Sequence, residues 1–107
     1  MKKIEILDAQ QLKKFRDDKP NKESVWSDKD GNINLICMRP GQEIITHTHH
    51  GSHIWIVMEG EGELFSGGKK EVIGNGKIVV VPPMVDHGIR NPTGKDLVIA
   101  SLTAKGD

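Results

Sequence analysis

Four of the five histidines in this sequence lie close together, at His47, His49, His50 and His53, and the fifth, His87, follows a Pro-Pro pair much later. A neutral imidazole is a common ligand for first-row transition metals, so this concentration predicts a metal site. Side chains two residues apart on a strand share a face, so we expect His47 and His49 to point together and His50 to point away. His53 follows a Gly-Ser bend where a second strand can return beside the first. His87 begins a later strand that could reach the same interior point.

Three further side chains are candidates for lining a pocket around this site. Trp55 has the same strand parity as His53, so it either lines the cavity or packs in the core or at a subunit interface. Met84 lies near the mouth of the site and could touch a substrate. Met38 is the third candidate, although methionines such as Met38 and Met84 more often fill gaps in a core.

Other residues near the histidines have simpler interpretations. We expect His50 to face solvent or to support the site from outside. Cys37 is expected to be a buried strand residue rather than a redox-sensitive thiol, because nothing nearby suggests a lowered pKa. Asp86 is next to His87 but on the opposite face by alternation, so it is expected to be solvated. The alternative is that Asp86 accepts a hydrogen bond from a histidine N–H.

The elements that must position these residues begin with a short N-terminal extension, residues 1–22. Ile4–Leu7 is predicted to form an edge strand. Asp8 can cap a helix of one or two turns over Ala9–Phe15, with Gln11 at the capping-box position and Leu12 and Phe15 on the buried face.

From residue 23 onward the apolar pattern has the period of strands, and glycine, proline and asparagine mark the turns between them. The segment 28–32 contains the aspartate, glycine and asparagine residues that are typical of a hairpin turn. We predict roughly nine or ten short strands, the later ones at 23–27, 33–39, 43–49, 53–58, 63–66, 71–73, 77–81, 87–90 and 96–103. Such a series indicates an all-β sandwich or barrel with no helix after the first.

Two of these strands, Ile54–Met58 and Ile78–Val81, are apolar on both faces. A strand with one face in water should alternate, so something must cover the outer face. A second subunit is the simplest cover and predicts a homodimer. The alternative is that the N-terminal helix and the terminal strands cover it within one chain.

Composition excludes several classes of protein. A chain of 107 residues is one domain, 1–107. Fifteen basic and fifteen acidic residues balance, so neither nucleic acid nor an anionic membrane is an expected partner. The single cysteine, Cys37, cannot form an internal disulfide. Acidic residues come too early in the sequence for the apolar region of a signal peptide, and no apolar run is long enough to span a membrane. We therefore expect a cytoplasmic protein.

Two segments of the chain resemble the paired motifs of the cupin superfamily. Gly41 is followed by five residues, His47-Thr48-His49, three residues, His53, six residues and Gly60. After an interval of fifteen residues, Gly76 is followed by five residues, Pro82-Pro83-Met84, two residues, His87, three residues and Asn91. Two positions depart from the family pattern, because His53 stands where a glutamate is usual and Met84 where a glycine is common.

The resemblance covers residues 33–102 and implies a cupin-type double-stranded β-helix, or jelly-roll barrel, that is often a homodimer. It also implies one divalent metal per chain, bound by His47, His49, His53 and His87. Four neutral histidines leave a charge of +2 on a divalent complex, whereas three histidines and a glutamate leave +1. That donor set favours iron, manganese, nickel, copper or zinc over magnesium, and it favours anionic ligands.

Two functions are compatible with this sequence. One is a metal-dependent oxidoreductase, most plausibly a dioxygenase, acting on a small organic molecule. Glu43 and Glu63 are the nearest candidates for a general acid or base, and neither is convincing, which favours redox or Lewis-acid chemistry. The alternative is a non-enzymatic cupin that binds or senses a small ligand or a metal.

Overall fold

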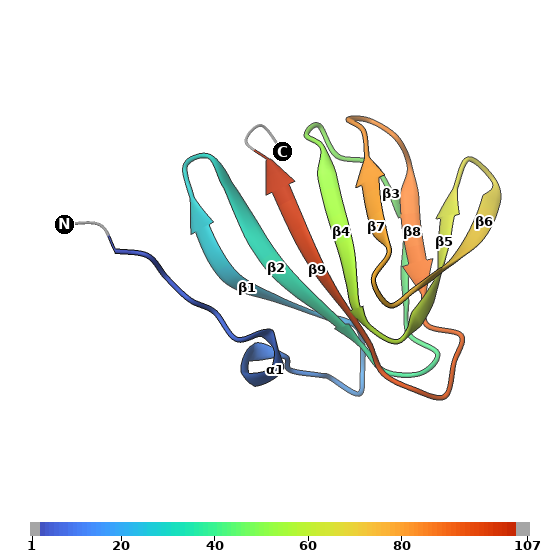
Figure 1. The fold of residues 1–107 in the computed structure, drawn as a ribbon. Coiled ribbons are helices and arrows are strands. Elements are labelled where there is room, and N and C mark those ends of the chain that lie inside the picture. The colour runs from blue at the N-terminus through green and yellow to red at the C-terminus, as the bar shows by residue number, and fades with distance from the viewer. Residues whose placement is uncertain (1–2, 105–107) are drawn as a thin grey trace.

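The computed structural model describes residues 3–104, which form two antiparallel sheets packed face to face and one short helix (Figure 1). One sheet has the strand order β1-β2-β9-β4-β7 and the other β3-β8-β5-β6. The two sheets do not join into a closed barrel, and the all-β sandwich that the strand pattern predicts is confirmed. The elements are α1 (Ala9–Leu12), β1 (Asn21–Asp28), β2 (Gly31–Met38), β3 (Glu43–His47), β4 (His53–Glu59), β5 (Glu61–Ser66), β6 (Lys69–Gly74), β7 (Ile78–Val81), β8 (His87–Arg90) and β9 (Leu97–Ala104).

The hairpin between β1 and β2 shows how local chemistry fixes the register of the larger sheet. Asp28 pairs with Gly31 across a two-residue turn, and its carboxylate accepts from the backbone N–H of Asp30 at 2.7 Å. A Cβ at Gly31 would lie 2.6 Å from the carbonyl oxygen of Thr103 on β9, so only glycine lets β9 approach this closely. The predicted turn over residues 28–32 is confirmed.

The main core lies between the two sheets and is aliphatic apart from Trp55. Its fully buried members come from both sheets: Ile36, Met38, Trp55, Val57, Ile73, Ile89, Leu97 and Ile99. A second, smaller cluster lies on the outer face of the larger sheet, where Leu12 and Phe15 pack against Leu35, Cys37 and Val98. The predicted buried face of the N-terminal segment is confirmed, and so is the burial of Cys37.

The N-terminal segment differs from the prediction in two ways. Ile4–Leu7 does not join a sheet, and the side chains of Ile4 and Ile6 are both 92% exposed. The segment runs outward past β1 (Figure 1), and a hydrogen bond from the Trp26 indole to Glu5 at 3.1 Å links the two. An apolar run becomes a strand only where its backbone can pair with a sheet edge, and this segment pairs with none. Asp8 does cap α1, accepting from the N–H of Gln10, but the helix ends at Leu12 rather than Phe15.

Among residues 3–104, no helix is long and apolar enough to cross a membrane. Most predicted strands are present with bounds shifted by one or two residues. The exception that affects the site is β3, which ends at His47 and leaves His49 in the following loop.

Candidate metal centre

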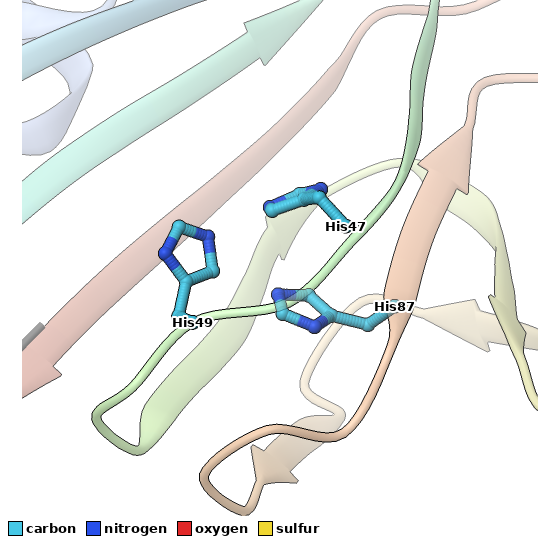
Figure 2. A group of neighbouring side chains, drawn as sticks. All are labelled: His47, His49 and His87. Atoms are coloured by element: carbon cyan, nitrogen blue, oxygen red, sulfur yellow. The ribbon is translucent and has the colours of Figure 1, made fainter.

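Four histidines gather at one end of the space between the sheets, and they come from both of them. His47 is the last residue of β3 and pairs directly with His87, the first residue of β8. His49 follows in the loop after β3. His53 is the first residue of β4, which belongs to the other sheet. Figure 2 shows the rings of His47, His49 and His87 turned toward a common space.

The rings are close enough to act as one donor set. The ring centroids of His47 and His87 lie 4.5 Å apart, and those of His47 and His49 lie 4.6 Å apart. One ring nitrogen from each of these three residues lies within 4.8 Å of the others. The ring of His53 lies 4.1 Å from that of His49 and 5.6 Å from that of His87. Imidazole nitrogens that share one metal at about 2.0–2.1 Å are roughly 3–4 Å apart, so small ring movements would bring these donors to coordinating positions.

The backbone fixes which nitrogen of two rings carries the proton. The Nδ1 atoms of His47 and His87 each lie 2.9 Å from a carbonyl oxygen two residues earlier, that of Ile45 and Val85 respectively. A carbonyl can only accept, so Nδ1 donates in both rings and Nε2 keeps its lone pair. Nε2 of His87 is buried and has no hydrogen-bond partner among the described residues. A buried lone pair without a donor is what a metal ligand presents, so these residues fit the predicted ion.

Electrostatics favour the neutral, ligand form of the buried ring. Burial lowers the pKa of His87, and the nearby His47, His49 and Lys22 lower it further, while the hydrogen bond to Val85 opposes the shift. His53 is 6% exposed, and its Nδ1 lies 3.4 Å from the hydroxyl oxygen of Thr103. A neutral imidazole can coordinate a metal without first losing a proton.

The other predicted residues have clear positions relative to this cluster. His50 is exposed, as expected. Trp55 is 2% exposed, and its ring lies 5.4 Å from that of His87, so it forms part of the floor beneath the histidines. Met38, the third pocket-lining candidate, lies in the main core. Met38 is completely buried and pairs with Leu97, at the end of β2 away from the site.

The loop between β7 and β8 holds Met84 and Asp86 beside the site. Met84 is 57% exposed and has a positive φ of 63°, a conformation that side-chain-bearing residues rarely adopt. Its N–H donates to the carbonyl of His49 at 2.8 Å, which ties the two histidine-bearing loops together. The carboxylate of Asp86 accepts from the N–H of Gly67 in the β5–β6 turn rather than from a histidine.

Neither acidic candidate lies in the cluster. Glu63 is on the outer face of its sheet, where its carboxylate lies 3.7 Å from Arg90 and 4.0 Å from Lys70. Glu43 is exposed and pairs with Arg90 along β3, on the face opposite Ile44. Within residues 3–104, the group of side chains placed to hold an ion consists of histidines.

Sequence reasoning missed three supporting partners. The carbonyls of Ile45 and Val85 orient two of the rings, and Thr103 contacts a third. A main-chain carbonyl has no residue-specific signature. The Thr103 contact follows only from the register of β9 beside β4, in which Thr103 pairs with His53.

Comparison with known proteins identifies the fold. The model of the Cupin domain family matches residues 34–103. A protein from Klebsiella pneumoniae with a double-stranded β-helix domain is 26% identical, with a TM-score of 0.91 over 98% of this chain and 93% of that one. A cupin protein from Desulfovibrio desulfuricans, described as RmlC-like, is 29% identical, with a TM-score of 0.78 over 97% of this chain and 96% of that one. A Thermus thermophilus protein at 24% identity and a TM-score of 0.89, covering 95% of this chain and 98% of its own, shows the same fold. No curated protein matches the chain.

Proposed function

This chain belongs to the cupin family, and from that premise we propose that it binds one divalent transition metal through His47, His49, His53 and His87. The observation that carries the proposal concerns the ring of His87, which lies among three other imidazoles. Its Nδ1 is held by the backbone, and its buried Nε2 has no hydrogen-bond partner in the part of the chain that the structure describes. The role of His53 rests on its ring contacts and on its position in the motif.

The donor set determines what the centre would bind. Four neutral imidazoles leave the full charge of a divalent ion at the site, which attracts carboxylate, enolate or hydroxide. Nitrogen donors favour iron, manganese, nickel, copper or zinc over magnesium. On an octahedral ion, four protein ligands leave two positions for substrate or small molecules. When bound, such an ion supplies Lewis-acid or redox chemistry.

The reaction class that we propose is oxidoreduction of a small organic molecule by a dioxygenase or a related oxidoreductase. The support is that Glu43 and Glu63 both lie away from the histidines, so side-chain acid–base chemistry has no candidate carboxylate there. Trp55 and the aliphatic core beneath it would keep water from one side of the reacting molecule. The second candidate is a non-enzymatic small-ligand or metal-binding cupin, which the same geometry also supports.

Metal content is the first test. Untagged protein purified without chelator or added metal should contain close to one iron, manganese, nickel, copper or zinc ion per chain by elemental analysis. His47→Ala and His87→Ala should each lower affinity for that ion by orders of magnitude. His50→Ala is the matched control, because His50 is exposed and is not part of the group of histidines placed to hold an ion. A protein that takes up none of these ions, or that loses its metal only in His50→Ala, would overturn the proposal.

The reaction class needs a separate test. Protein loaded anaerobically with each metal is exposed to oxygen in the presence of a diketone, flavonol or thiol panel, and oxygen uptake is recorded. Uptake with one metal and one substrate class, lost in His87→Ala, supports the enzyme. Ligand-induced thermal stabilisation without turnover would favour the binding protein instead.

We also propose that two copies associate through the outer face of β4 and β7. Ile78 and Val80 are 65% and 66% exposed, and they pair across the strands with Ile56 and Ile54. The N-terminal segment does not cover this face of β4 and β7, because the part that includes α1 packs against β2 and β9 instead. The patch carries no charge and the chain is neutral overall, so two identical faces would meet without repulsion. A contiguous apolar patch of this kind is typical of an interaction surface.

A further inference from the structure

The inner face of the larger sheet changes from aliphatic to polar side chains next to the histidines. Strand register places two rows of side chains across this face, and each runs from a valine on β7, Val81 or Val79, through β4 at the site toward β1. Cross-strand neighbours in the first row are His53, Thr103, Asn32 and Ser27, and in the second row Trp55, Ser101, Asn34 and Ser24. On the β1 side of β4, every member of both rows is a hydroxyl or an amide. We call these six residues the polar strip.

The strip is confined to the two rows nearest the metal centre. The next row along the same face is Val57, Ile99 and Ile36, which belong to the buried aliphatic core. Ser101 and Thr103 are themselves 4% and 8% exposed, so these hydroxyls are largely withdrawn from water. Burying hydroxyl and amide groups is unfavourable unless they are hydrogen-bonded, and aliphatic side chains would stabilise this position better. A role in stability alone therefore does not account for Ser101 and Thr103. Burial decreases toward the edge of the sheet, where Asn32 and Asn34 are half-buried and Ser24 and Ser27 are exposed.

One atom of the strip lacks a partner in the folded chain. The Oδ1 of Asn32 is buried and has no hydrogen-bond partner among the described residues. This oxygen can only accept, so its missing partner must be a donor. The adjacent Thr103 hydroxyl already lies beside His53, which makes the strip continuous with the histidine cluster.

We propose that the polar strip binds the hydroxyl group of a small hydroxycarboxylate whose carboxylate end lies at the metal centre. This inference rests on the proposed metal site, because the uncompensated positive charge there selects the anionic end. The other end must carry a neutral donor. An ammonium group would call for a carboxylate partner, and the strip consists only of hydroxyls and amides.

Strand spacing sets the length of such a ligand. Neighbouring strands are about 4.8 Å apart, so β9 and β2 lie roughly 5 and 10 Å from β4. A hydroxyl several bonds away from the carboxylate would reach the strip, whereas one on the adjacent carbon would remain at the metal. The probe pair is therefore 4-hydroxybutyrate and butyrate, which carry the same charge and differ in one distant hydroxyl.

Isothermal titration calorimetry on metal-loaded protein tests the inference without any requirement for turnover. We expect 4-hydroxybutyrate to bind at least about tenfold more tightly than butyrate, because a site built to bond a hydroxyl discriminates strongly against its absence. In Asn32→Leu the preference should fall below about threefold while metal content is unchanged. Asn21→Leu is the matched control. It makes the same change on the same sheet, but Asn21 pairs with Cys37, whose side chain lies on the outer face.

The outcomes separate this inference from the proposed function. If the wild-type protein takes up no metal, the proposed function fails and the inference falls with it. If metal binds normally but neither probe binds, or both bind equally, the inference alone is wrong. A preference that survives in Asn32→Leu and Asn34→Leu would also overturn it, because the hydroxyl would then be recognised elsewhere.

Discussion

The sharpest prediction concerns two valines of similar exposure that lie on the outer faces of different sheets. Val80 on β7 is 66% exposed and lies on the outer face of the five-stranded sheet, within the proposed subunit contact. Val72 on β6 is 61% exposed and lies on the outer face of the four-stranded sheet. Val80→Lys and Val72→Lys therefore place the same charge at sites of nearly equal exposure.

The magnitude follows from the area that remains to be buried. Full burial of a valine or isoleucine side chain stabilises by about 1.5–3 kcal/mol, so the exposed two thirds of Val80 would contribute roughly 1–2 kcal/mol on association. A two-fold contact contains the side chain twice, so Val80→Lys should weaken the dimer by roughly 2–4 kcal/mol, or about 30- to 1000-fold in Kd. The folding stability of the isolated chain should change by less than about 0.5 kcal/mol in either variant, because both side chains are exposed within the chain.

Sedimentation velocity over a range of concentrations measures the effect, and circular dichroism confirms that each variant is folded. Wild type and Val72→Lys should sediment as dimers with similar Kd values, and Val80→Lys should shift toward monomer. A wild-type protein that stays monomeric at high concentration would refute the reasoning. So would a dimer that Val72→Lys disrupts and Val80→Lys does not, because the contact would then lie on the other sheet.

Three further predictions concern the folded chain itself. Gly62→Ala should lower the free energy of unfolding, measured in urea, by about 1–3 kcal/mol, because the new Cβ would lie 2.9 Å from core side chains. Gly74→Ala is the control and should change it far less, because its nearest contact would be at 3.6 Å. Burial raises the pKa of the Cys37 thiol, so the unfolded chain loses this proton at lower pH than the folded one, and stability should fall as the pH rises through about 9. Cys37→Ala should remove that part of the slope in denaturation measured between pH 7 and 10. Burial lowers the pKa of His87, so below about pH 6.5 the unfolded metal-free chain takes up a proton that the folded chain resists, and stability should fall with falling pH. His87→Gln should make that acid-side slope shallower in thermal melts of metal-free protein.

Strand alternation and turn chemistry made most of the fold predictable. The structure confirms the predicted burial of Cys37 within a strand. His50 is exposed as predicted, but it lies in the loop after β3, so strand alternation is not the reason for its exposure. The helix cap at Asp8 and the turn over residues 28–32 depend only on residues within a few positions, so they can be predicted from the neighbouring sequence alone.

Features that depend on register could not be predicted in the same way. The sequence leaves Met38 open as a pocket-lining or a core residue, and only the pairing of β2 with β9 shows that it lies at the end of the strand away from the histidines. An irregularity in β3 between Ile44 and His47 sets the pairing of His47 with His87, and no spacing in the sequence marks it. Ile4–Leu7 has the composition of a strand, but whether it pairs depends on a free sheet edge.

The same kind of hydrogen bond, from the ring to a nearby backbone carbonyl, orients two histidines that are forty residues apart in the chain. In each case the ring bonds to the carbonyl two residues before it, Ile45 for His47 and Val85 for His87, and the two residues then meet as partners across β3 and β8. A carboxylate in either position would orient the ring equally well, but it would add a negative charge beside the site. Neutral backbone partners fix the tautomer and leave the charge of a bound ion undiminished. With His53 in place of a glutamate, the centre would then depend on an incoming anion for charge balance, which is why we look for its ligand among carboxylates.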